Sequence, residues 1–135
     1  MKIKIPIQVR FRDIDAMGHV NSAVYLSYFE QGRVAYGREV LGVTRANDFN
    51  FVIAEIRCRY RSPVKLEDEI FLSIGIDEVK RSSFRFCYRL EKSDGTLAAE
   101  GESVQVMYDY RSEKAMSIPA EVRQKISDWE EISFD

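Results

Sequence analysis

Residues 21–41 read NSAVYLSYFEQGRVAYGREVL, and their spacing predicts one long helix. The side chain of Asn21 or Ser22 could cap its first turn, and Gly42 ends it after about Leu41. Apolar and aromatic side chains cover most of its circumference, whereas a surface helix has a single stripe; they are Val24, Tyr25, Leu26, Tyr28, Phe29, Val34, Ala35 and Tyr36. We therefore expect this helix to be enclosed by other elements.

Strand-like segments flank the predicted helix, because apolar and polar residues alternate in them as in half-buried strands. One segment precedes the helix and four follow it; they are Ile3 to Phe11, Phe51 to Ser62, Ile70 to Ile76, Phe84 to Leu90 and Leu97 to Tyr110. In the second of these segments the predicted core-facing residues are Val52, Ala54, Ile56, Cys58 and Tyr60. A last helix after Pro119 presents one apolar stripe made of Val122, Ile126 and Trp129.

The order of the elements is strand, helix, four strands and helix, without the alternation of strands and helices that builds a parallel sheet. The sequence therefore predicts an α+β fold in which an antiparallel five-stranded sheet wraps around the long central helix, with a C-terminal helix beside it. Because the chain has 135 residues and 45% apolar content, we expect residues 1–135 to form a single domain.

Charge and cysteine content narrow the range of partners and locations. The 20 basic and 22 acidic residues are interspersed, which argues against a nucleic-acid partner. The sequence shows no apolar run long enough for a signal sequence or a membrane span. Cys58 and Cys87 lie in strand-like segments, as expected for reduced structural thiols of a cytoplasmic protein.

Residues 13–22 read DIDAMGHVNS and place two carboxylates, a glycine and the only histidine at the start of the predicted helix. Hydrolysis of a thioester requires a carboxylate that attacks the carbonyl carbon or activates water, and donors for the oxyanion that develops. A helix N-terminus offers unpaired amides, so those near Ser22 and Ala23 could polarise the carbonyl while Asp15 acts from the loop. Gly18 allows the tight turn that this arrangement needs.

The chain resembles the 4-hydroxybenzoyl-CoA thioesterase family, the hotdog-fold acyl-CoA thioesterases, in Asp13-x-Asp15-x-x-Gly18-His19-Val20-Asn21 followed by Tyr25-Leu26-x-Tyr28-Phe29-Glu30. The resemblance implies that Asp15 is the nucleophile or general base, that the Ser22 amide holds the thioester carbonyl, and that no cofactor takes part. It also implies a homodimer or homotetramer with active sites at subunit boundaries. The hydroxybenzoyl enzyme has a tryptophan-containing stretch after its glycine, where this chain has residues 19–21, so an aromatic acyl group is not implied.

Further residues are predicted to contact the substrate. Lys80 and Arg81 match the basic stretch with which the family meets the CoA phosphates, although both could also be solvated turn residues. Asn21 and Tyr25 are predicted substrate contacts, with a helix cap and a core position as their alternatives. His19 is expected to hydrogen-bond the loop, with an auxiliary role in positioning substrate or water left open.

Three functions fit these residues. The first is acyl-CoA hydrolysis, and the second is binding of acyl-CoA or acyl carrier protein without turnover. The third is enoyl-CoA hydration or dehydration, for which His19 is the sole histidine; its place in the thioesterase motif argues against this function.

The remaining charged residues of the motif are expected to have structural roles. Asp13 is predicted to hold its own turn, and Glu30 is the reserve catalytic acid or else pairs with Arg33. We expect no metal site, because a single histidine cannot form a histidine cluster and Val24 stands where a calcium loop needs glutamate.

Overall fold

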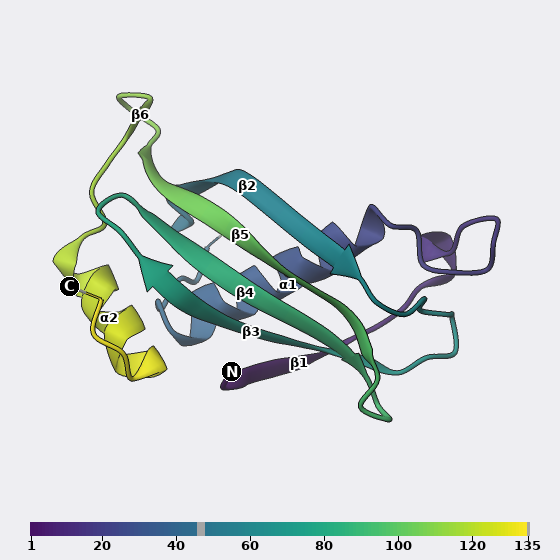
Figure 1. Cartoon of the computed structure of the whole chain (residues 1–135). Helices are drawn as coiled ribbons and strands as arrows, with labels where there is room; N and C mark the ends of the chain where they lie inside the picture. Colours follow the sequence, from purple (N-terminus) through teal and green to yellow (C-terminus); the bar gives the residue numbers. More distant parts are fainter. Residues whose placement is uncertain (46–47, 135) are drawn as a thin grey trace.

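The computed structural model describes residues 1–45 and 48–134, in the order β1 (Ile3–Ile7), the 3-10 helix η1 (Phe11–Asp13), α1 (Val24–Glu39), β2 (Phe51–Tyr60), β3 (Ile70–Val79), β4 (Ser83–Lys92), β5 (Leu97–Asp109), β6 (Lys114–Ala115) and α2 (Ala120–Glu130). The strands pair antiparallel in the order β1-β3-β4-β5-β2, and the short β6 pairs with β5. Helix α1 crosses one face of the curved sheet, and α2 lies at one end of it (Figure 1). The predicted α+β fold, with a five-stranded antiparallel sheet, a long helix and a C-terminal helix, is confirmed, whereas the short sixth strand β6 was not predicted.

The core lies between α1 and the inner face of the sheet, where the alternation in β3 and β4 places every second residue. These inner residues are at most 2% exposed; they are Ile70, Leu72, Ile74, Ile76, Phe84, Phe86, Tyr88 and Leu90. Helix α1 contacts β1, β3 and β4. Phe29 of α1 stacks on Tyr88 with 4.2 Å between ring centroids. Gly32 approaches β3 so closely that an added Cβ would lie 2.6 Å from Leu72 Cδ2, so a larger residue here would displace the Leu72 side chain.

The described part of the chain covers α1 on one side. The buried residues of the helix are Tyr25, Tyr28, Phe29, Gly32, Arg33, Tyr36 and Gly37. Glu30 is exposed, and a surface pocket between α1 and the start of β2 is bordered by Glu30, Val34 and Ile53. The predicted pairing of Glu30 with Arg33 is wrong, because Arg33 turns toward the sheet and donates a hydrogen bond to Tyr88 Oη at 3.0 Å. The apolar circumference of α1 is thus only partly covered within one chain.

Strand β2 departs from the predicted alternation in its first half. Its register against β5 shifts between Ile53 and Glu55, which is the signature of a β-bulge. The extra residue leaves Ile53 and Ala54 exposed, so the prediction that Ala54 faces the core is wrong. Beyond the bulge, Ile56 and Cys58 pack against the core as predicted, while Tyr60 is 50% exposed.

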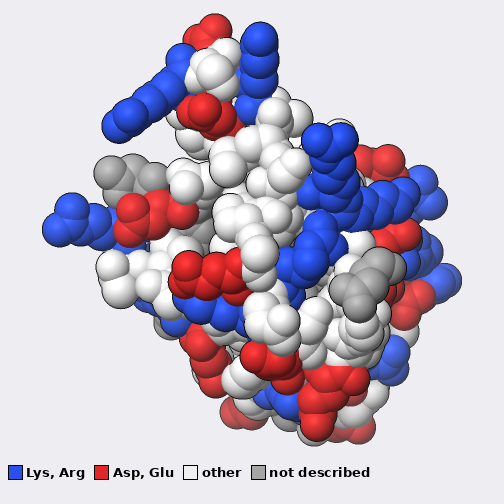
Figure 2. Space-filling model, turned by 90° about the vertical axis from the view of Figure 1, so that its left-hand side faces the viewer, with Lys and Arg blue, Asp and Glu red and all other residues white. Residues whose placement is uncertain are grey.

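Helix α2 closes the end of the sheet that lies farthest from the start of α1 (Figure 1). The predicted stripe is confirmed, since Ile126 is fully buried and Val122 and Trp129 pack against the core. The Glu130 carboxylate accepts hydrogen bonds from Tyr36 Oη at 2.7 Å and from the Ile76 N–H at 3.0 Å. Figure 2 views this end and shows acidic and basic side chains intermixed over it. None of the helices in residues 1–45 and 48–134 has the length and apolarity to span a membrane.

Candidate active site

Asp13 holds the segment between β1 and α1 in place. Its Oδ2 accepts hydrogen bonds from the Arg10 N–H at 2.9 Å and from Tyr28 Oη at 2.8 Å. Burial, together with this hydrogen bond to the Asp13 carboxylate, raises the pKa of the Tyr28 hydroxyl. These contacts tie the loop to the first turns of α1, which is the structural role predicted for Asp13.

Asp15 lies two residues later at the base of a tight loop. The loop is closed by the hydrogen bond from the Asp15 N–H to the His19 carbonyl at 2.7 Å, and Gly18 takes a φ of +82° that favours glycine. Asp15 Oδ1 accepts the N–H groups of Met17 at 2.8 Å and of His19 at 3.2 Å. Within residues 1–45 and 48–134, Oδ2 of this half-buried carboxylate has no hydrogen-bond partner. One oxygen is therefore anchored and the other is available for chemistry.

The start of α1 is built by Asn21. Its Oδ1 accepts the Ala23 N–H and its carbonyl accepts the Val24 N–H, both at 2.9 Å. This turn delays the first helical residue to Val24, so the predicted start at Asn21 or Ser22 is two to three residues early. The Ser22 N–H has no acceptor in the described part of the chain. It lies at the positive end of the helix dipole, where it can receive a developing negative charge.

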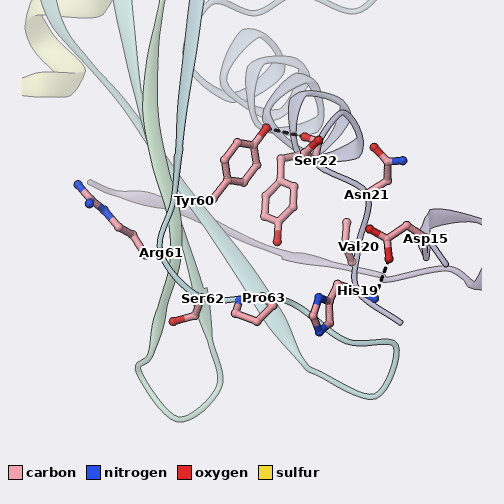
Figure 3. A pocket seen from close by; sticks show the side chains of 10 residues that line it. Asp15, His19, Val20, Asn21, Ser22, Tyr60, Arg61, Ser62 and Pro63 are labelled. Carbon is pink, nitrogen blue, oxygen red and sulfur yellow. Dashed lines mark hydrogen bonds between the residues drawn. The ribbon is translucent and has the colours of Figure 1, made fainter. Parts of the chain in front are cut away.

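These groups line one open pocket of about 340 Å³, whose walls come from the loop, from α1 and from the segment that follows β2. The lining residues are Asp15, His19, Val20, Asn21, Ser22, Tyr25, Tyr60, Arg61, Ser62 and Pro63 (Figure 3). Tyr25 is 3% exposed and packs edge-on against Tyr60, with 4.9 Å between ring centroids. At the rim, Arg61 Nη2 pairs with Glu100 at 2.9 Å. The pocket thus combines a carboxylate, a free amide and an aromatic wall.

The structure brings together five of the seven predicted site residues. Asp15, His19, Asn21, Ser22 and Tyr25 all border the pocket.

The other two, Lys80 and Arg81, lie in the turn between β3 and β4. Ile7 at the end of β1 pairs with Ile70 at the start of β3, so the loop that follows β1 lies at the opposite end of the sheet from this turn (Figure 1). There Lys80 approaches Glu78 at 3.9 Å, and Arg81 donates to Ser117 Oγ at 3.2 Å.

Sequence reasoning missed the segment 60–63. Tyr60 was predicted as a core residue of a strand, although its hydroxyl reaches the Ser22 carbonyl oxygen at 2.6 Å. The available signal was Pro63, which ends the strand, so that the polar residues Arg61 and Ser62 lie just beyond the last residue of β2.

Glu30, the reserve acid, is not among the residues that line the pocket. In the described residues, no three His, Cys, Asp or Glu side chains form a group able to hold a metal ion.

The chain is similar to a family of known proteins. A family model described as the thioesterase-like superfamily matches residues 9–126. The acyl-CoA thioesterase YbgC of Haemophilus influenzae is 31% identical over 124 residues, covering 87% of this chain and 89% of that protein. The long-chain acyl-CoA thioesterase FadM of Escherichia coli is 25% identical over 123 residues, covering 89% and 93%.

Solved structures agree with this assignment. A thioesterase from Thermus thermophilus, solved with coenzyme A and zinc, superposes with a TM-score of 0.86 at 32% identity, covering 95% of this chain and 94% of that chain. A predicted thioesterase from Bacillus stearothermophilus has the same fold, with a TM-score of 0.86 at 20% identity. The chain belongs to the thioesterase-like superfamily, as the motif between residues 13 and 30 predicted.

Proposed function

We propose that this protein hydrolyses acyl-CoA thioesters and that Asp15 is the catalytic carboxylate. The observation that carries the proposal is that Asp15 and Ser22 line the same pocket, while Asp15 Oδ2 and the Ser22 N–H have no hydrogen-bond partner among residues 1–45 and 48–134. Relatives named acyl-CoA thioesterases supply the substrate class.

In the proposed reaction, the thioester carbonyl oxygen lies against the Ser22 N–H, and the carbonyl carbon faces Asp15 Oδ2. The carboxylate either attacks this carbon directly or removes a proton from a water molecule that attacks it. Negative charge then develops on the carbonyl oxygen and is stabilised by the amide and the helix dipole. The bond from carbon to sulfur breaks and the CoA thiolate takes up a proton. When water is the attacking group, this step releases the acid directly. When the carboxylate attacks, an anhydride between the acyl group and Asp15 remains, and water then hydrolyses it to the free acid and the free Asp15 carboxylate.

Asp15 Oδ1 supports this role by orienting the carboxylate. Two backbone N–H groups hold it, so the free oxygen is aimed without losing side-chain entropy at the moment of reaction. His19 contributes its backbone to this clamp, and we propose only an auxiliary role for its ring. Asn21 shapes the helix start, and Tyr25 forms the wall against which an acyl group would pack.

The assembly and location that we propose also rest on features of the chain. Strand β2 is at the edge of the sheet beside the uncovered side of α1, so a second copy can extend the sheet there. Only in such a homodimer, or a homotetramer built from it, would Lys80 and Arg81 serve a pocket, because they lie far from the pocket of their own chain. Light scattering would test this, and a monomer would contradict it. The free thiols of Cys58 and Cys87 fit a reducing compartment such as the cytoplasm.

The replacement Asp15→Asn tests the proposed function. It keeps the shape and the amide contacts of the side chain but removes its charge, so we expect kcat to fall by about 100-fold to 10,000-fold. Free thiol released from a panel of short, long, branched and aromatic acyl-CoAs measures the rate, and the melting temperature checks the fold. The matched control is Asp128→Asn, which should keep turnover because Asp128 is an exposed residue of α2, at the end of the sheet opposite the pocket (Figure 1).

Two results would contradict the proposal. Retained turnover in Asp15→Asn would remove Asp15 from the mechanism. Tight binding of acyl-CoA or of an acyl carrier protein without thiol release by the unchanged protein would instead identify a binding module.

A further inference from the structure

We propose that Tyr60 is a positioning residue for catalysis, whose hydroxyl fixes the orientation of the Ser22 amide. This inference rests on the proposed function, since it assigns Ser22 N–H to the oxyanion. Tyr60 is the last residue of β2, 38 positions away from Ser22, and its Oη donates a hydrogen bond to the Ser22 carbonyl oxygen at 2.6 Å (Figure 3). It therefore links the sheet directly to the start of α1.

The peptide group between Ser22 and Ala23 is held at both of its ends. Its N–H donates to Asn21 Oδ1 at 2.9 Å, and its carbonyl accepts the hydroxyl of Tyr60. This peptide group follows the Ser22 N–H directly along the chain, so its orientation constrains the backbone angles that aim that N–H. Without the Tyr60 hydroxyl, the turn made by Asn21 would be the only remaining restraint on the Ser22 to Ala23 peptide group among the described residues.

The ring of Tyr60 is itself well placed to act as a restraint. It meets the buried Tyr25 at an interplanar angle of 88°, which keeps the half-exposed side chain against the pocket wall. Because this contact involves only the rings, it does not depend on the hydroxyl. Replacement by phenylalanine thus leaves this packing and removes the hydrogen bond to Ser22, together with the contact between the hydroxyl and the Cys58 thiol.

Orientation of the amide matters because an oxyanion donor acts only within about 2.7–3.1 Å of the oxygen that it stabilises. A displacement of about 1 Å in an active site can cost about 100-fold in rate. The Tyr60 hydroxyl has a single proton, which it donates to the Ser22 carbonyl, so in this arrangement it does not protonate the substrate. Its contribution is to hold the donor in place before the substrate arrives.

The test compares Tyr60→Phe with the unchanged protein on the best acyl-CoA of the panel. We expect kcat to fall by about tenfold, less than the roughly 100-fold cost of losing a whole oxyanion donor, while KM stays within about twofold. The shape of the pH-rate profile should remain unchanged, because no proton transfer is lost. The control is Tyr110→Phe, which removes an exposed hydroxyl that donates to the Phe51 carbonyl at 3.5 Å, and it should leave kcat unaltered.

Each other outcome would overturn the inference. An unchanged kcat would show that the hydroxyl does not orient the amide. A raised KM with an intact kcat would mean that Tyr60 contacts the substrate, and loss of one limb of the pH-rate profile would make it a proton donor. Failure of the proposed function is distinguishable, since the unchanged protein would then release no thiol at all.

Discussion

Arginine side chains lie against both faces of the sheet, and the two faces differ in the partners that they offer to the guanidinium group. On the outer face, Arg59 forms a bidentate pair with Glu102 at 2.9 and 2.7 Å, and Arg85 forms one with Asp77 at 2.8 and 3.1 Å. These side chains remain open to water. Against the inner face, Arg33 of α1 is 7% exposed and donates to the hydroxyl of Tyr88.

The inner contact is part of a buried polar chain. Tyr88 Oη is hydrogen-bonded to Ser103 Oγ, which donates to Gln105 Oε1, and Ser103 and Gln105 are fully buried. No carboxylate pairs with Arg33 in the part of the chain that the structure describes. A buried guanidinium whose contacts are incomplete is costly, whereas an exposed ion pair contributes little. We therefore expect the ion pairs of the outer face to contribute less to stability than the buried hydroxyl group of Tyr88.

The tight packing of the inner face is tested most severely by Gly101→Ala, where β2 and β5 approach each other. An added Cβ would lie 2.0 Å from the Arg57 carbonyl oxygen, and this backbone atom cannot move aside like a side chain. We expect a loss of about 3 kcal/mol in the free energy of unfolding, measured with urea. Gly75→Ala is the control, because the nearest atom to its Cβ is Glu130 Oε1 at 3.4 Å. Equal stability of the two variants would contradict the expectation.

Removal of the inner hydroxyl by Tyr88→Phe should cost about 2 kcal/mol, because the buried Arg33 and Ser103 both lose a partner. The stacking on Phe29 remains. A double-mutant cycle with Arg33→Met isolates the coupling, and the double variant should lose less than the sum of the two single changes. Strict additivity would show that Arg33 and Tyr88 do not depend on each other.

We expect the smallest loss of stability from a substitution on the outer face of the sheet. Arg59→Met should shift the urea midpoint by less than Tyr88→Phe does, and the shift should shrink in high salt. The hydrogen bond from Arg59 lowers the pKa of Glu102 below its usual 4.5. The stability that this pair contributes is therefore present above about pH 4.5 and is lost as the pH falls through the lowered pKa. A shift from Arg59→Met that persists under such acidic conditions would contradict this account.

Much of the fold could be predicted from the sequence because its signals are local. Alternation with a period of two identifies the strands in residues 70–90, and the crowding of aromatics between Tyr25 and Tyr36 identifies the central helix. The bulge in β2 could not be predicted, because a register shift is a property of the pair of strands. The inward turn of Arg33 also depends on Tyr88, 55 positions along the chain.

The candidate site, too, could be predicted only where its residues are close in sequence. Asp15, Asn21 and Ser22 are close in sequence, so their motif and the turn chemistry of Gly18 predicted a shared pocket. Tyr60 enters that pocket from another element, and its partner Ser22 follows from topology rather than from spacing. Lys80 and Arg81 could be assigned to a turn, but only the strand order shows at which end of the sheet this turn lies.

The position of Trp129 on α2 has a practical consequence for spectroscopy. It is the only tryptophan in the chain, its ring lies 5.3 Å from Lys2 Nζ, and it packs at the end of the sheet opposite the Asp15 loop (Figure 1). Intrinsic fluorescence therefore reports whether α2 is docked, and the Asp15 pocket of the same chain lies at the other end of the sheet. The same optical signal can follow unfolding in the variants above, while turnover is read separately from the released thiol.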